Sequence, residues 1–418
     1  MANSLVTNQV IARKFISISR NKNAFLQNMD RQYDPEFERT GAKVGQNIRI
    51  RLPVEYVLRT GPTAIVQDSV QKSVNLPVAT QAGVDMSFSS VDRTMNIDRF
   101  TDNFIAPAVN TVIGGIASDV MAGCEGNVSN WVANQDPTTG ALLSPTANTW
   151  LNAKASLENN AVPDSNYKII MAPATQANTV ASLAGLFNSQ PILAKQYENG
   201  DMTRALGFDW MVDQTVIIHT TGAYVAGGAF VATKGFPSGS TVTGANQVGS
   251  VLTVSATTGP LAKGDIITVD GVFNVNPVNK NSTGRLKHFT VTAPVAGGAT
   301  TIPIYPPILG VTGGGAAQQY QTVTASPANA AVVYVSAAPS SVYRKNLAYV
   351  PKALTLASVD MIAPPNVDVA REVYDEVSVR VLTQYQGNSD QLLTRLDLLY
   401  GFSYLKPEWM VCVPDPLT

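Results

Sequence analysis

The first thirty residues carry apolar side chains at helical spacing, with basic residues on or beside the polar side. The apolar positions are Val6, Val10, Ile11, Phe15 and Ile18, and the basic positions are Arg13, Lys14, Arg20 and Lys22. This pattern predicts an amphipathic N-terminal arm. Three roles stay open for it: packing on its own domain, docking on a neighbouring subunit, or, through its local positive charge, contact with nucleic acid.

From about residue 44 the pattern changes to strict alternation. In "GQNIRIRLPVEYVLRTGP" the apolar side carries Ile48, Ile50 and Leu52, and the charged side carries Arg49 and Arg51. A period of two predicts a strand, and a second extended run, "SVQKSVNLPVATQAGVDMSFS", follows a Gly-Pro break. The two runs are expected to form a long hairpin. A two-stranded ribbon is marginal alone in water, so it either crosses a neighbouring subunit or folds back on its own sheet.

A long helical pattern then runs from about Ile97 to Trp131. The Gly114-Gly115 pair inside it costs roughly 1 kcal/mol per glycine relative to alanine, so a bend or a close helix contact is expected there. A second helix is predicted over 149–160, a buried strand over 168–171 and a third helix from about 174. Helices that alternate with apolar strands indicate an α/β or α+β core.

Composition changes sharply from about Thr220 to Tyr343. Helix signals vanish, and short apolar runs recur: "SVLTVSA", "DIITVDGVFNV", "HFTVTAP", "TTIPIYPP" and "AVVYVSA". Their spacing predicts an all-β sandwich or barrel, with one turn at Lys263-Gly264-Asp265. Mixed character returns with "NLAYVPKALTLASVDM", so the all-β module is predicted to be an insertion into another domain.

The C-terminal runs "VSVRVLTQYQ" and "LLTRLDLLYGFSYLKPEWMVCV" alternate again and predict strands that return to the main core. Arg380, Arg395 and Asp397 interrupt these apolar runs. They are predicted to lie on the solvent side or to face another subunit.

The composition suits a subunit that is covered by its neighbours. The chain has 418 residues, which is too long for one ordinary core, and only 14% are charged against 45% hydrophobic. A net charge of -1 excludes a general electrostatic attraction for nucleic acid or membranes. Two cysteines and the lack of a signal-like or membrane-length apolar run lead us to expect folding in a reducing cytoplasm, with no membrane span.

The sequence lacks the residue combinations that catalytic and metal sites require. Only two histidines, His219 and His288, are present, and no carboxylate is spaced to join either in a metal site or proton relay. The run "GVTGGGAAQQ" lacks the strand-then-helix context of a phosphate-binding loop. Cys124 falls within the long helical pattern and is predicted to be buried and inert. No catalytic, cofactor-binding or metal site is predicted. A buried cluster of carboxylates with shifted pKa values would instead support the hypothesis of an enzyme.

Taken in order, the segments resemble the major capsid (coat) proteins of tailed double-stranded-DNA bacteriophages, which share the Hong Kong-type capsid fold. The resembling stretches are "GQNIRIRLP", "ALGFDWMVDQTV", "TGPLAKGDIITVDGVFNVNP", "KALTLASVDM", "VSVRVLTQY" and "RLDLLYGFSYLKPEWMV". The closer likeness is to the subgroup with an inserted Ig-like or telokin-like β-domain, typified by a short-tailed Salmonella phage coat protein. One loop departs from it, because "FPSGSTVTGANQVG" is nearly uncharged where those relatives carry charges.

The resemblance implies an α+β phage capsid fold and a particular order of domains along the chain. It implies an N-terminal arm (1–42), an extended hairpin loop (43–80), a peripheral domain with a spine helix (81–135), the first half of an axial domain (136–219), an inserted all-β domain (220–345) and C-terminal strands of the axial and peripheral domains (346–418).

The implied function is structural, with no enzymatic activity and no cofactor. Copies would assemble as pentamers and hexamers into an icosahedral virion capsid around double-stranded DNA, in the cytoplasm of the host bacterium. The implied partners are the protein itself, a scaffolding protein, a portal protein and packaged DNA through weak non-specific contact, with no membrane. Candidate subunit-contact residues are Arg13, Lys14, Arg20, Arg49, Arg51, Glu55 and Arg59. The alternative is a surface-displayed binding protein that uses the insert, although its loops hold few aromatic residues for sugar binding.

Overall fold

The computed structural model describes residues 24–33, 47–56, 58, 61–62, 71–89, 106–163, 166–183, 204–310, 318–362, 364, 367–374, 377–388 and 391–417. Residues 1–23 of the predicted N-terminal arm, which include all of its named apolar and basic positions, and most of the glycine-rich run after Gly310 lie outside them. The chain divides into two compact units. Unit 1 comprises Met1–Leu52, Lys72–Val120 and Leu354–Leu405, and unit 2 comprises Pro53–Gln71, Met121–Ala353 and Lys406–Thr418.

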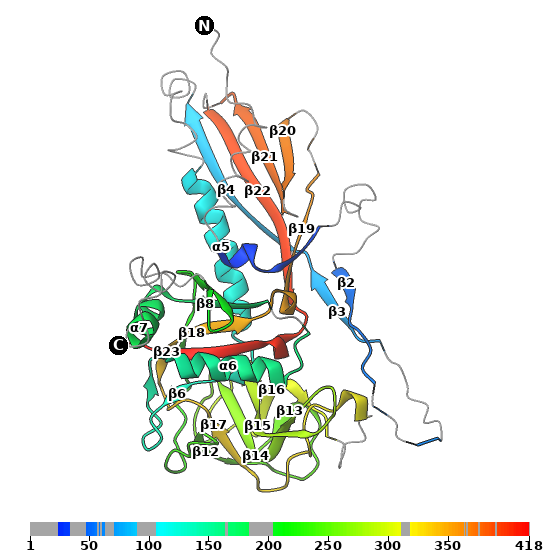
Figure 1. The fold of residues 1–418 in the computed structure, drawn as a ribbon. Coiled ribbons are helices and arrows are strands. Elements are labelled where there is room, and N and C mark those ends of the chain that lie inside the picture. Colours follow the sequence, from blue (N-terminus) through cyan, green and yellow to red (C-terminus); the bar gives the residue numbers. More distant parts are fainter. Residues whose placement is uncertain are drawn as a thin grey trace. The chain divides into compact units, whose positions relative to one another are not determined.

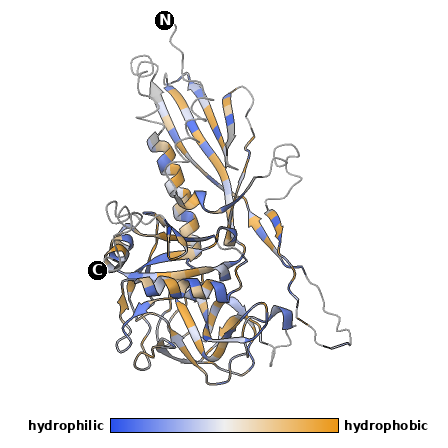
Figure 2. Ribbon diagram, in the orientation of Figure 1, coloured by the Kyte–Doolittle hydropathy of each residue, from blue (hydrophilic) through white to orange (hydrophobic). Residues whose placement is uncertain are grey.

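Unit 1 is built on a six-stranded sheet (Figure 1). Its strands are β1 (Asp30–Tyr33), β19 (Leu354–Val359), β22 (Gln391–Tyr404), β21 (Val377–Gln386) and β20 (Asp368–Tyr374) in that order, with β4 (Thr80–Ser89) also paired to β22. The long β22 pairs β4 along its first ten residues and β19 along its last six. Polar and apolar residues alternate along β21 and β22, as the sequence predicts (Figure 2).

The predicted long helix is real but shorter than expected. Helix α5 spans Ala106–Cys124, and the start of the predicted range, 97–105, lies outside the described residues. Its end was predicted wrongly, because Trp131 lies in strand β5 (Asn130–Trp131). The Asn127 side chain donates to the Gly123 carbonyl over 2.8 Å and satisfies one of the carbonyls that a helix end leaves unpaired. A short helix, α2 (Ala24–Gln27), precedes β1.

Of the two alternatives expected at the glycine pair within α5, a close helix contact is not found among the described residues, and a bend stays a prediction. A Cβ placed on Gly114 or Gly115 meets nothing within 4 Å. The double substitution Gly114→Ala, Gly115→Ala is therefore expected to raise the free energy of unfolding, by roughly 1 kcal/mol per site, through the better helix propensity of alanine. Urea unfolding of the full chain measures this. A loss of stability would mean that the pair has a packing partner that the described residues do not provide.

The predicted hairpin is confirmed at its root. Strand β2 (Asn47–Arg51) pairs antiparallel with β3 (Ser73–Pro77), with Ile48 opposite Leu76. Ile48 and Ile50 are half-buried and pack with Leu76, whereas Arg49 and Arg51 are exposed. The same apolar cluster includes residues of β19 and β22, so the root of the hairpin folds back on the sheet of its own unit.

Unit 2 holds a second sheet covered by a helix. The sheet order is β5, β23 (Met410–Pro416), β18 (Val342–Tyr349), β8 (Tyr167–Met171), β10 (Phe208–Val212) and β9 (Arg204–Ala205), with β11 (Ile218–Thr220) also paired to β18. Helix α6 (Ala147–Asn159) buries Trp150, Ala153 and Leu157 against this sheet, as their helical spacing requires. The predicted second helix, the 168–171 strand and the third helix, α7 (Pro173–Leu183), are confirmed. A small ladder of β6 (Asn134–Gln135) and β7 (Leu142–Leu143) completes the described strands of this region.

Between β11 and β18 the chain forms a closed antiparallel barrel. Its strands, in hydrogen-bonded order, are β12 (Phe236–Thr241), β17 (Val332–Val335), β14 (Ile266–Val275), β15 (Ser282–Val291), β16 (Thr301–Ile308) and β13 (Gly249–Thr253). The ring closes where Ser255 N donates to Thr241 O over 2.7 Å and Thr243 N donates to Thr253 O over 3.0 Å. Five strands match the predicted runs. Of the two architectures left open by the sequence, the barrel is the observed one; an Ig-like sandwich has two separate sheets and is not supported by this topology.

Candidate functional site

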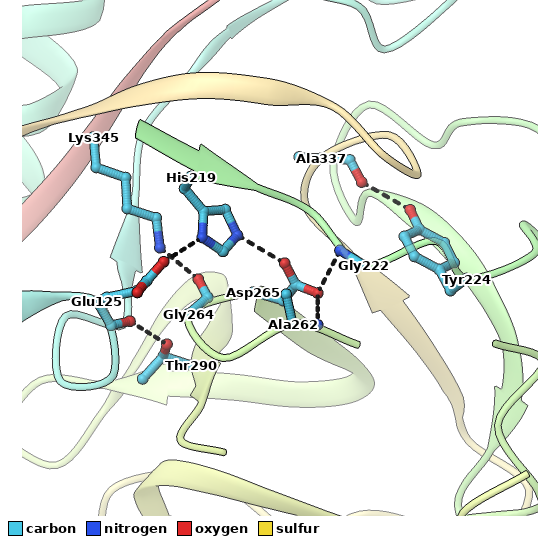
Figure 3. A network of polar contacts seen from close by, with 10 residues as sticks. All are labelled: Glu125, His219, Gly222, Tyr224, Ala262, Gly264, Asp265, Thr290, Ala337 and Lys345. Carbon is cyan, nitrogen blue, oxygen red and sulfur yellow. Dashed lines mark hydrogen bonds and ion pairs between the residues drawn. The ribbon is translucent and has the colours of Figure 1, made fainter. Parts of the chain in front are cut away.

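A buried charged cluster lies in unit 2 where the barrel adjoins strands β11 and β18 (Figure 3). His219 on β11 contacts a carboxylate with each ring nitrogen: Nδ1 lies 2.6 Å from Glu125 Oε1, and Nε2 lies 2.9 Å from Asp265 Oδ1. The His219 side chain is 1% exposed and that of Asp265 is 0% exposed. Lys345 on β18 is also buried, and its Nζ donates to the Gly264 carbonyl over 2.7 Å.

Local structure explains how these groups meet. Glu125 immediately follows the last residue of α5, and Asp265 closes the predicted turn just before β14. Gly264 in that turn has a φ of +91°, and a Cβ there would collide with Glu125 and Lys345, so only glycine suits the position. The second oxygen of Asp265 accepts the backbone N–H groups of Ala262 (2.8 Å) and Gly222 (3.1 Å).

The two basic side chains of the cluster, His219 and Lys345, face its two carboxylates, Glu125 and Asp265. Burial alone would raise the pKa of Glu125, but the hydrogen bond from His219 and the positive charge of Lys345 outweigh it and hold that pKa below its ordinary value. Burial lowers the pKa of Lys345, although the nearby carboxylates oppose this shift.

The lowered pKa of Glu125 predicts acid sensitivity. A carboxyl whose pKa is depressed by folding contributes stability above its unfolded-state value, here about 4.5, and loses it as pH falls through the folded-state value. The urea midpoint of Glu125→Gln is therefore expected to lie below that of the parent chain by a constant amount above pH 4.5. The gap should shrink on further acidification. A gap that is independent of pH would contradict this role for the carboxylate.

The cluster is a structural site rather than a reaction centre. The cavity beside Lys345 has a volume of about 10 Å³, at the lower limit for a single water molecule, and leaves no room for a substrate. Cys124 and Cys412 line it and are buried, as predicted for Cys124, and burial raises the pKa of Cys412 to about 11. Within the described residues, no group of three or more histidine, cysteine or acidic side chains is placed to hold a metal ion.

The sequence shows no spacing that supplies carboxylates to a histidine, yet two carboxylates contact His219 in the fold. Its partners lie 94 and 46 residues away in the chain, so no local spacing could reveal them. The sequence indicates only the turn that contains Gly264 and Asp265, which was predicted as part of the all-β module.

The candidate subunit-contact residues fall into three groups. Arg13, Lys14, Arg20 and Arg59 lie outside the described residues. Arg49 and Arg51 project from the exposed face of β2, with Arg49 Nε donating to Ser73 Oγ over 2.9 Å. Glu55 is engaged within unit 2, where its carboxylate lies 3.2 Å from Lys280 Nζ and 3.6 Å from Lys406 Nζ.

The predicted solvent-side trio of the C-terminal strands is instead an internal ion-pair network. Asp397 is 1% exposed and contacts Arg380 Nη2 at 2.6 Å and Arg395 Nε at 2.7 Å. Burial alone would raise the pKa of Asp397, but the two arginines and Gln81 hold it below its ordinary value. The prediction was wrong for Asp397, which is buried opposite Arg380 of the neighbouring strand. The Arg380 and Arg395 side chains are 14% and 42% exposed, and their facing another subunit stays a prediction.

Comparison with protein families gives a match along nearly the whole chain. A family model described as "P22 coat protein - gene protein 5" matches residues 1–413. No curated protein sequence matches.

Solved structures that resemble the chain include phage capsids. The capsid of cyanophage P-SCSP1u is 8% identical, with a TM-score of 0.45 over 94% of this chain and 88% of that chain. The mature capsid of bacteriophage PhiM1 is 9% identical, with a TM-score of 0.43 over 94% and 86%. The CUS-3 coat protein I-domain is 30% identical, with a TM-score of 0.20, and covers 23% of this chain and 93% of its own.

Proposed function

Because the chain belongs to the P22 coat protein family, we propose that its copies assemble as pentamers and hexamers around packaged double-stranded DNA. The protein is a structural major capsid protein of a tailed phage, forms an icosahedral shell in the virion, and is not an enzyme. The observation that carries this function is the family match along residues 1–413. The mixed architecture of two sheets, two long helices and a barrel accords with the expected α+β capsid fold.

The proposed partners beyond the protein itself follow from the family. We propose that a scaffolding protein directs assembly, that a portal protein occupies one vertex, and that assembly takes place in the host cytoplasm. A net charge of -1 supports weak, non-specific contact with the packaged DNA. Within the described residues, no helix is both long and apolar enough to cross a membrane.

The barrel supports the proposed subgroup with an inserted β-domain. It lies between β11 and β18, two strands of one sheet, which is the arrangement expected of an insertion over 220–345. The remaining domain boundaries stay proposals: 1–42, 43–80, 81–135, 136–219 and 346–418.

The direct test of the shell function is assembly. Full-length protein, purified alone or with its scaffolding protein, is expected to form capsomers or megadalton shells visible by negative-stain microscopy. A monodisperse monomer that persists at high concentration with the scaffolding protein present would contradict the function.

Deletion of about 223–343 separates this function from a surface-displayed binding protein. The deletion removes Asp265 and leaves His219 and Lys345 without their barrel partners, so a loss of stability is expected under either function. The shell function predicts in addition that assembly fails, whereas a binding protein would lose only its ligand.

The exposed arginines of the hairpin root are the strongest described candidates for subunit contact. We expect the double variant Arg49→Gln, Arg51→Gln to have a free energy of unfolding within about 0.5 kcal/mol of the parent chain, since exposed residues contribute little to stability. Shell yield, measured by sedimentation, is expected to fall several-fold. Unchanged yield would remove both residues from the subunit contact.

A further inference from the structure

A polar cavity in unit 2 takes no part in the charged cluster. Its volume is about 230 Å³, and its lining includes Asn152 of α6, Lys234 before β12, and Arg285 and His288 of β15. At about 30 Å³ for each water of the liquid, it has room for roughly seven waters, or for a phosphate or carboxylate group with part of its hydration shell. It is therefore large enough for a small ligand.

The lining carries positive charge without a carboxylate. Lys234 is paired with Asp270 at 2.8 Å, and Asp270 does not line the cavity. Arg285 is exposed and forms no ion pair or hydrogen bond with the described residues. Its guanidinium thus keeps an unneutralised charge at the mouth of the cavity.

The lowered pKa of His288 reflects, in part, the positive charges around the cavity. Burial, followed by the positive charges of Lys287 and Arg285, lowers its pKa to about 4. Lys287 donates to Asn274 Oδ1 over 3.0 Å. Burial lowers the pKa of Lys287, and the charge of Glu408, which does not line the cavity, opposes this shift. At neutral pH the ring is uncharged and offers one N–H donor, for which the described residues contain no hydrogen-bond partner.

We propose that this cavity binds a small oxyanion, a phosphate or carboxylate group, through the guanidinium of Arg285 with His288 and Asn152 as neutral donors. A guanidinium presents paired N–H groups that match the oxygens of such an anion. The anion supplies the negative charge that the lining lacks. It can come from solution or from an acidic side chain of a second copy of this chain in the shell, and the two sources share one chemistry.

The two histidines of the chain make a direct test practical. Full-length, unassembled subunits carrying ¹³C-labelled histidine are titrated with sodium phosphate, and separately with sodium chloride at equal ionic strength, while the ring resonances are followed by NMR. We expect a saturable shift of the His288 resonance with phosphate and a rise of its pKa by about 1–3 units, the effect of a nearby opposite charge. The buried His219 is the internal control and should not respond. No saturable shift, or an equal response to chloride or in both histidines, would overturn the proposal.

Matched variants assign the binding to Arg285. Arg285→Gln should abolish the phosphate response and leave the urea midpoint unchanged, since exposed residues contribute little to stability. Arg51→Gln, an exposed arginine of β2, should retain it. A response that survives Arg285→Gln would contradict the site.

Assembled shells distinguish the two sources. Modification of His288 by diethyl pyrocarbonate is measured by peptide mass in shells of the parent chain and of Arg285→Gln, first without phosphate and then with phosphate added. Protection of His288 in phosphate-free shells of the parent chain, and not of Arg285→Gln, indicates an acidic side chain of a neighbouring copy. Protection that requires added phosphate indicates a dissolved anion. No protection in either condition would overturn the proposal for the shell.

Discussion

Asp265→Ala is expected to lower the free energy of unfolding by about 3–5 kcal/mol, the usual cost of removing one partner from a buried ion pair. The substitution takes away the acceptor of three groups: His219 Nε2 and the backbone N–H groups of Ala262 and Gly222. The bonds to His219 and Gly222 are buried, so these two groups cannot recover their hydrogen bonds from solvent, whereas the bond to Ala262 is partly buried. The loss should appear in urea unfolding of the full chain, as a fall in the midpoint.

A matched control lies five residues further along the chain. Asp270 also pairs with a cation, Lys234, but its side chain is 42% exposed. Asp270→Ala is expected to cost only about 0–1 kcal/mol, as exposed pairs do. Equal losses for the two alanine variants would show that the buried cluster contributes no more than a surface ion pair.

Gly401→Ala is expected to disrupt the hairpin root and sharply reduce shell assembly. A Cβ at Gly401 of β22 would collide with the carbonyl of Pro77, the last residue of β3. Backbone atoms cannot rotate aside as side chains do, so β3 must move away from β22. We expect a stability loss of about 1–3 kcal/mol, typical of overpacking, together with loss of shells in sedimentation.

Gly387→Ala provides the comparison within the same unit. A Cβ there meets only the Tyr385 ring, at an ordinary contact distance of 3.7 Å. We expect this variant to unfold within about 0.5 kcal/mol of the parent chain and to assemble normally. If both glycine variants assemble equally well, close approach at the hairpin root is not needed for the shell.

Elements with a strong local pattern could be predicted from the sequence. Alternation at Ile48 and Ile50 gave both the strand and the face that packs inward, because a period of two places every second side chain on one side. Five barrel strands were found by the same reasoning. The sixth, β12 with the sequence "FPSGST", was missed because its glycine, serine and proline residues resemble a loop, and the closing of the barrel makes it a strand.

Features that depend on distant contacts could not be predicted. The end of α5 depends on the Asn127 side chain, and the burial of Asp397 depends on arginines from two strands. The charged cluster depends on Glu125, His219 and Asp265, which belong to three separate segments and meet only when the barrel is in place. An aspartate in a sequence offers no sign of whether water or an arginine will surround it.

The pairing of β11 with β18 makes the barrel a replaceable module. Ile218, His219 and Thr220 lie opposite Arg344, Tyr343 and Val342, so the two chain segments that lead into and out of the barrel form a stem. The strand pairing of the stem involves no barrel residue, and Tyr343 also pairs with Pro416 of β23 on its other side. A gene fusion that exchanges the segment between Thr221 and Ser341 for another folded domain with neighbouring termini should therefore preserve the parent sheet. Such a graft must bring its own hydrogen-bond partners for His219 and Lys345, and a design that supplies both would display a chosen domain on every subunit of the shell.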